Sequence, residues 1–192
     1  MRAFLLIVAL SLATPCLAQS PHWEVFGGYS MQHSTVREYY KSTPIIYSIR
    51  NLDESLTGWT VSFTENLSRK RIGGTLEVSG HYKSPVLLTV TTRQRIHSIM
   101  YGPRVSILKN GPIRPFAHVL VGLAHAEAAI KPTGAHGSDY AIAEALGGGV
   151  DIRIGKKVAV RALQAEYFRA NLLGTKPHSY RASTGIVFYL GK

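Results

Sequence analysis

The side chains with the clearest chemical potential stand at alternating positions of one segment. Glu77, Ser79 and His81 are separated by two residues each. In an extended strand, residues i and i+2 share one face, so the three side chains would point the same way. A serine, a histidine and a carboxylate on one face are the parts of a hydrolase. They also form ordinary hydrogen-bond networks on polar strand faces, and we predict that no residue of this chain is catalytic.

The other histidines give no metal or cofactor site. His97-Ser98 and His178-Ser179 are adjacent pairs, so in a strand their two side chains point to opposite faces. His118 and His125 are seven residues apart and therefore also lie on opposite faces. No group of His, Cys, Asp and Glu has the spacing of a metal site. The sequence predicts neither a metal ion nor a cofactor.

A second notable set of side chains consists of equal numbers of acidic and basic residues. Four acids and four bases fall on the polar faces of alternating segments: Glu24, Glu77, Asp151 and Glu166, and Arg104, Arg153, Arg161 and Arg181. A charge that is removed from water must be paired. Since Gly, Ser and Thr lie nearby, the equal numbers predict an ion-pair network in a narrow lumen. The alternative is that some of these eight lie at strand ends in water.

Eight segments that alternate apolar and polar residues must position these charges. A period of two is typical of half-buried β-strands. The segments are His22–Met31, Leu56–Glu65, Ile72–Tyr82, Ile96–Leu108, Pro115–Glu127, Asp139–Ile154, Val158–Arg169 and Ser179–Gly191.

Two of these segments break the alternation. Arg161 shares a face with Gln164 and Glu166 only if Ala162 and Leu163 form a bulge. Glu144 has the parity of Val150 and Ile152, which are apolar. The intervening residues, Gly147–Gly149, would permit a kink that turns Glu144 to the polar face.

The connections between the segments alternate in length. Gln32–Ser55, Lys83–Arg95, Ala128–Ser138 and Ala170–His178 are long, whereas Asn66–Arg71, Lys109–Arg114 and Gly155–Lys157 are short. This rhythm is typical of outer-membrane barrels, and lipid accepts only helices and closed barrels as spanning structures. We therefore predict an all-β fold: an eight-stranded antiparallel up-and-down transmembrane β-barrel that forms one domain, residues 19–192.

The first residues predict export. Arg2 precedes the apolar run Ala3–Ala13, and Cys16 and Ala18 supply the small residues of a cleavage site, so residues 1–18 form a signal peptide cleaved after Ala18. A lipoprotein signal that uses Cys16 is the alternative. The net charge of +11 suits lipid phosphate better than nucleic acid, because the chain is exported and lacks nucleic-acid-binding fingerprints. The charges could equally serve to solvate loops.

Aromatic residues gather near the ends of the predicted strands. Rings of this kind favour the interface between lipid and water. The residues are Trp23, Trp59, Tyr82, Tyr101, Tyr167, Phe168, Tyr180 and Phe188.

Several short motifs resemble landmarks of the small eight-stranded outer-membrane barrels: Tyr101–Ser106, Arg114–His118, Ala145–Asp151, Arg161–Tyr167 and Arg181–Phe188. Most of the chain after the leader resembles the barrel domain of the OmpA-like superfamily. The resemblance implies a monomeric barrel in the outer membrane of a Gram-negative bacterium, inserted by the barrel assembly machinery, with salt bridges plugging the lumen. We expect the barrel domain only. The chain departs from the family at its end, where Phe188-Tyr189 is followed by Leu190-Gly191-Lys192.

The expected role is structural or adhesive, through surface interactions of the long loops Gln32–Ser55 and Lys83–Arg95. Their bases and tyrosines suit contact with lipopolysaccharide: Tyr39, Tyr40, Lys41, Lys83, Arg93 and Arg95. One alternative is a soluble, lipocalin-like periplasmic carrier of a lipophilic ligand, with its apolar face inward. A second is a lipid-modifying barrel enzyme that uses His81, and a third is a narrow, porin-like channel.

Overall fold

A computed structural model describes the chain over residues 22–43, 46–67, 71–83, 86–87, 90–107, 112–131, 135–171 and 178–190. All regular secondary structure in these ranges is β-strand. Among the described residues there is no helix with the length and hydropathy needed to cross a membrane. The predicted signal peptide, residues 1–18, lies outside the described part of the chain.

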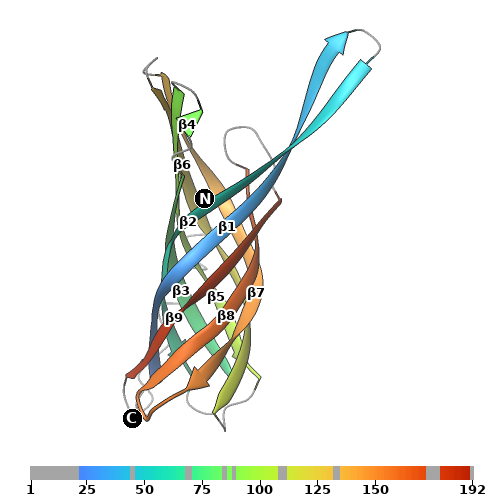
Figure 1. Cartoon of the computed structure of the whole chain (residues 1–192). Helices are drawn as coiled ribbons and strands as arrows, with labels where there is room; N and C mark the ends of the chain where they lie inside the picture. Colours follow the sequence, from blue (N-terminus) through green and yellow to red (C-terminus); the bar gives the residue numbers. More distant parts are fainter. Residues whose placement is uncertain are drawn as a thin grey trace, which may run out of the picture.

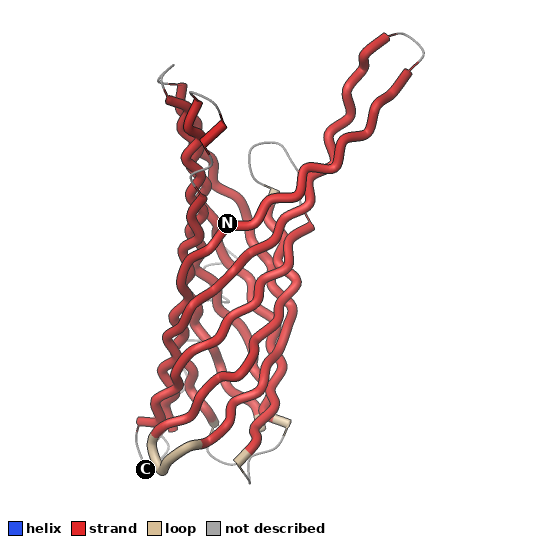
Figure 2. The backbone as a smooth tube through the Cα atoms, in the orientation of Figure 1, coloured by secondary structure: helices blue, strands red, loops and turns tan. Residues whose placement is uncertain are grey.

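The strands form one antiparallel sheet that closes on itself (Figures 1 and 2). Each long strand pairs with the next along the chain, β9 pairs with β1, and β3 pairs with β5 across the two-residue strand β4. The prediction of an eight-stranded up-and-down barrel is therefore confirmed. The strands are β1 (His22–Thr43), β2 (Ile46–Asn66), β3 (Ile72–Lys83), β4 (Val86–Leu87), β5 (Val90–Ser106), β6 (Ile113–Lys131), β7 (Ala135–Arg153), β8 (Val158–Ala170) and β9 (His178–Leu190).

The two ends of the barrel differ. At one end, which we call the short-turn end, tight connections join β2 to β3, β5 to β6 and β7 to β8, and the first residue of β1 and the last of β9 lie there too. At the opposite, long-loop end, β1 and β2 run well past the rim of the barrel (Figure 1).

The first predicted loop is wrong. The segment Gln32–Ser55 is mostly strand, because β1 and β2 stay paired as far as Thr43 and Ile46. β1 pairs with β9 only up to Thr35, so the outer part of this hairpin is a two-stranded ribbon (Figure 1). The outer parts of the two strands pair only with each other, and their sequence lacks the alternation that reveals a strand. The segment Lys83–Arg95 likewise contains β4 and the start of β5.

Side chains alternate between a polar interior and an apolar exterior. On β3, Thr75, Glu77, Ser79 and His81 are buried while Leu76 is exposed. The outer face carries large apolar side chains around the whole barrel, among them Phe63, Leu76, Tyr101, Val121, Leu146, Leu163 and Ile186. This is the reverse of the apolar interior that the lipocalin-like alternative requires, and the structure contradicts that alternative.

Of the two irregularities predicted from the sequence, the structure confirms one and contradicts the other. The bulge in β8 is confirmed: its register with β9 shifts between Arg161 and Gln164, and Ala162 and Leu163 both face outward. The predicted kink in β7 is wrong, because the register of β7 with β6 is unbroken and Glu144 is exposed on the apolar outer face.

The glycines of β7 serve a different purpose from a kink. A Cβ on Gly147 would collide with the Ala165 carbonyl oxygen of the neighbouring strand β8. Glycine therefore allows the two backbones to approach closely at this point.

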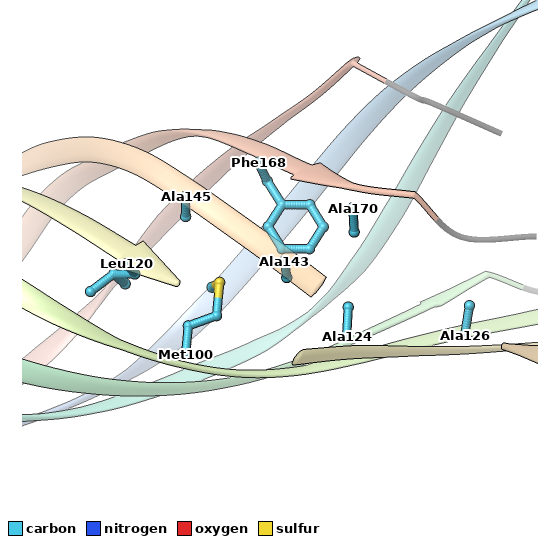
Figure 3. Close-up of a cluster of buried hydrophobic side chains, with 8 residues drawn as sticks. All are labelled: Met100, Leu120, Ala124, Ala126, Ala143, Ala145, Phe168 and Ala170. Carbon is cyan, nitrogen blue, oxygen red and sulfur yellow. The ribbon is translucent and has the colours of Figure 1, made fainter. Parts of the chain in front are cut away.

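The interior also holds an apolar cluster on β5 to β8, toward the long-loop end (Figure 3). Its members are Met100, Leu120, Ala124, Ala126, Ala143, Ala145, Phe168 and Ala170. Phe168 is thus an interior side chain and not the interfacial ring that its position near a strand end predicts.

We expect arginine substitutions on the outer face to cost stability according to depth. Leu76 lies midway along β3, so Leu76→Arg should lower the free energy of unfolding by about 2–4 kcal/mol, because a charge in the middle of the bilayer is expensive. Ile113 is the first residue of β6, and Ile113→Arg should cost about 0–1 kcal/mol. Urea titration of the protein folded in lipid vesicles measures both values. Equal costs at the two positions would contradict the assignment of the outer face to lipid.

Candidate functional site

An ion-pair cluster centred on Asp151 occupies the interior near the short-turn end. Asp151 Oδ1 accepts a hydrogen bond from Arg161 Nε at 2.7 Å. Its Oδ2 accepts from Arg161 Nη2 and from Arg104 Nη2, each at 3.1 Å. Arg104 Nη1 also lies 2.8 Å from Glu24 Oε2. All four side chains are buried, so β1, β5, β7 and β8 are tied together by charge-assisted bonds.

A second cluster lies further along the interior, around Arg181. Arg181 Nη2 is 3.0 Å from Glu77 Oε1 and 2.9 Å from Glu166 Oε2. Its Nη1 donates to Ser79 Oγ at 2.9 Å, and His118 Nε2 lies 2.7 Å from Glu166 Oε1. The cluster joins β3, β6, β8 and β9.

Gln164 connects the two clusters. Its Nε2 donates to Glu77 Oε2 and to Glu166 Oε1, each at 3.0 Å, and its Oε1 accepts from Arg161 Nη1. Arg104 Nη1 donates to Thr64 Oγ1 of β2 at 3.2 Å, which brings in the eighth strand of the barrel. A single polar network therefore contacts every strand of the barrel wall.

Aromatic rings cover the flat faces of the buried guanidinium groups. A guanidinium donates hydrogen bonds only in its own plane, so its faces are free to stack on a ring. Arg104 and Arg161 lie over the Phe116 ring, with their Cζ atoms 3.9 and 4.4 Å from its centroid. Arg161 also lies 4.1 Å from the centroid of Phe26. Arg181 stacks on Phe168 at 4.6 Å. Cation–π contact of this kind stabilises a charge where water is excluded.

The structure brings seven of the eight predicted network residues together: Glu24, Glu77, Arg104, Asp151, Arg161, Glu166 and Arg181. Arg153 differs from the prediction. It is exposed where β7 ends, and its Nε and Nη2 donate to the carbonyl oxygens of Gly155 and Lys156 at 3.1 and 3.0 Å. Its parity matches that of Asp151, but the strand stops there and its long side chain caps the following turn.

Two network members escaped the sequence analysis. Gln164 was placed on the polar face but carries no charge, and a count of charges therefore passes over it. His118 was tested only as a metal ligand. Its position two residues after Phe116 on the inward face of β6 was the available signal.

The predicted hydrolase-like face has other bonding partners. His81 is buried, and its Nε2 lies 2.9 Å from Ser30 Oγ. Ser79 bonds to Ser98 Oγ at 2.8 Å and to Arg181. His81 therefore lies on the interior face of β3, away from the outer face that a lipid in the bilayer would contact. Within the described ranges, no group of three His, Cys, Asp or Glu could hold a metal ion.

We expect the network to be sensitive to loss of a buried partner. Arg161→Met leaves Asp151 undercompensated and should lower the free energy of unfolding by about 3–5 kcal/mol. Arg161→Lys keeps the charge but loses the fork of donors, so it should fall between Arg161→Met and the unaltered protein. Arg153→Met, on the exposed turn, is the matched control and should cost only about 1 kcal/mol, because it loses exposed hydrogen bonds to Gly155 and Lys156 but leaves no buried charge unpaired. Urea titration in lipid vesicles measures all three, and equal losses at 153 and 161 would refute a stabilising role.

No protein-family model matches the sequence, and a comparison with curated proteins gives no match. Solved structures do match. Ail, the attachment invasion locus protein of Yersinia pestis, solved with the heparin analogue sucrose octasulfate, is 16% identical with a TM-score of 0.61, over 88% of this chain and 100% of Ail. Neisserial surface protein A is 12% identical with a TM-score of 0.66, over 89% of this chain and 99% of that protein.

A third match is the outer membrane protein OprG of Pseudomonas aeruginosa, 11% identical with a TM-score of 0.51, over 88% of this chain and 96% of OprG. At these identities the matches establish the fold. They also support the predicted location in the outer membrane of a Gram-negative bacterium. The chain has the fold of the small eight-stranded outer-membrane β-barrels, as its sequence motifs predict.

Proposed function

We propose that this chain is a monomeric, integral outer-membrane protein, inserted by the barrel assembly machinery, whose barrel is a closed scaffold for surface interaction at its long-loop end. The observation that carries the proposal is the ribbon formed by the outer parts of β1 and β2 (Figure 1). Beyond Thr35 and Thr57, no other described strand pairs with it. A ribbon with two free edges offers backbone groups as well as side chains to a partner.

The interior supports a plugged lumen. Buried ion pairs fill the part near the short-turn end, and the apolar cluster of Met100, Leu120, Phe168 and five alanines fills the side of β5 to β8 beyond it. An ion that entered would have to displace paired charges, which is costly. These contacts favour a closed scaffold over the porin-like alternative, and the proposal assigns the chain no catalytic activity.

Two exposed arginines at the long-loop end suit contact with an anionic glycolipid. Arg93 and Arg95 are exposed on β5 and face outward at this end. Ail was solved with sucrose octasulfate, a heparin analogue, so a barrel of this fold can hold a polyanionic sugar. By the same chemistry, the loop bases of this chain would contact the phosphate groups and sugars of lipopolysaccharide.

If the lumen is plugged, the barrel should not conduct ions. The purified protein in a planar lipid bilayer should show no steady conductance, whereas the double variant Arg161→Ala, Gln164→Ala should conduct because the link between the two ion-pair clusters is gone. The slower migration of the variant after boiling on a detergent gel is the control for folding. Steady conductance of the unaltered protein would refute the plug.

The ribbon should be dispensable for folding and necessary for surface interaction. Replacing residues 37–51 by an Asn-Gly turn removes only pairs that β1 and β2 make with each other. We expect the shortened protein to keep its heat-modifiable migration, since the barrel contacts of both strands remain. Attachment of bacteria that display it to host-cell or abiotic surfaces should fall to the level of cells without the protein. If bacteria with the shortened protein attach as well as those with the full protein, the ribbon is not the element that mediates surface interaction.

The loop bases should contribute to lipopolysaccharide binding through fixed charge. The triple variant Lys41→Gln, Arg93→Gln, Arg95→Gln should weaken binding about a hundredfold at low ionic strength, at about 1 kcal/mol for each base. Lys156→Gln, Lys157→Gln removes two exposed bases at the short-turn end and is the matched control. Binding is measured with the full chain in phosphatidylcholine nanodiscs. Unchanged affinity of the triple variant would rule out the loop contact.

A further inference from the structure

Four histidines face outward near the long-loop end of the barrel: His33, His97, His125 and His178. Each stands next to at least one buried, inward-facing residue on its strand, so its own side chain lies on the outer face. His97 on β5 is the register partner of His125 on β6. His178 on β9 is the partner of Thr35 on β1, two residues beyond His33. The four therefore form two neighbouring pairs on the barrel wall.

Aromatic side chains accompany the first pair, His97 and His125. The Tyr82 ring meets the His97 ring edge-on with centroids 5.4 Å apart, and Tyr82 Oη accepts a hydrogen bond from Trp59 Nε1 at 3.3 Å. Tyr140 stacks on His125 at 4.1 Å and is among the most exposed side chains described.

The second pair is arranged similarly. Tyr167 Oη lies 2.6 Å from His178 Nδ1, and the Tyr167 ring packs against Tyr180 at 5.6 Å. Tyr180 is the register partner of His33, whose Nδ1 lies 3.0 Å from Ser55 Oγ of β2. We call these residues the histidine–tyrosine belt: His33, Tyr82, His97, His125, Tyr140, Tyr167, His178 and Tyr180.

The belt lies at the edge of the lipid-facing surface. Toward the short-turn end, the same strands present exposed apolar side chains next to it: Met31 on β1, Ile99 on β5 and Leu123 on β6. Toward the long-loop end the charged side chains Arg95 and Glu127 follow. A belt at this boundary meets the headgroups of the lipids rather than their chains.

The fixed charges around the belt nearly cancel. Glu127 lies 3.9 Å from Arg95 and 3.2 Å from His125 Nε2, while His125 Nδ1 lies 3.2 Å from the Asp139 carbonyl oxygen. On the β7–β8 side, exposed Glu144 and exposed Arg169 are register partners.

The remaining charged groups near the belt are few. Arg93 is exposed on β5, and Asp53 is the register partner of Thr35. Lys83 directly follows the belt residue Tyr82, and Asp139 Oδ1 accepts a hydrogen bond from the Tyr140 backbone N–H at 2.8 Å. Protonation of four histidines would therefore make the belt strongly positive, and histidine is the residue type whose charge changes in the range from pH 8 to pH 5.

We propose that the histidine–tyrosine belt binds the phosphate groups of lipopolysaccharide in the outer leaflet and binds them more tightly in acid. Protonated imidazoles supply positive charge, and the exposed tyrosines supply hydroxyl donors for phosphate oxygens. The inference rests on the proposed function, in which the long-loop end faces outward. It differs from the loop contact in one measurable respect, since arginine and lysine keep their charge throughout this pH range and histidine does not.

The test compares affinity at pH 7.5 and pH 5.5 for the full chain in phosphatidylcholine nanodiscs titrated with purified lipopolysaccharide. The unaltered protein should bind about tenfold more tightly at the lower pH. The variant His33→Asn, His97→Asn, His125→Asn, His178→Asn should lose this increase and keep most of its affinity at pH 7.5. The variant with neutral loop bases should be weaker at both pH values and keep the increase, which separates failure of the belt from failure of the loop contact.

Two controls keep the test decisive. If the fourfold variant does not fold, judged by its migration before and after boiling, the variant His97→Asn, His125→Asn should lose part of the increase. Lipopolysaccharide stripped of its phosphates should show no increase with the unaltered protein. An increase that survives in the histidine variants, or that persists without phosphate, would overturn the proposal.

Discussion

Closure of the backbone ladder is the constraint on which the rest of the structure depends. In lipid every peptide group needs a partner within the protein, and the pairings of β1 with β9 and of β3 with β5 leave the barrel wall without an open edge. Once the wall is closed, every second side chain must point into the enclosed interior. The polar parity of the strands, the charge balance and the many small interior residues are consequences of that confinement.

The interior network gives the closed wall its register. Because the side-chain period is two, a slip of one residue in β8 would move Arg161 and Glu166 to the lipid face. The bulge at Ala162 and Leu163 lets Arg161 and Gln164 point inward together, although their spacing has the wrong parity for a regular strand. The network therefore requires the bulge, because it lets Gln164 point inward and connect the two ion-pair clusters.

The sequence predicts most of the wall and less of its surroundings. Alternation reveals the strands wherever one face meets lipid and the other the lumen, and parity alone locates the bulge in β8. Alternation fails for the outer parts of β1 and β2, which have no interior side. For Glu144 the alternation is correct, since its parity places the side chain on the outer face. The expectation that a carboxylate must face inward is what misleads there.

The level of a residue along the barrel axis is harder to predict than whether its side chain points inward or outward. The parity of Arg153 matched that of the network, but only the structure shows that β7 ends there and that the side chain turns back onto the following loop. The histidine–tyrosine belt was missed for a related reason. Its members come from seven strands. Their common level depends on the stagger between strands, which cannot be read from a single sequence.

The two-stranded ribbon has a consequence for how this surface can change over generations. Its shape depends on backbone pairing between β1 and β2, and the ladder there does not depend on which side chains its residues carry. Backbone pairing alone therefore places fewer demands on residue type in the ribbon than the buried ion pairs place on the interior of the barrel. Sequence drift can therefore alter the surface of this projection while the barrel wall beneath it stays as it is.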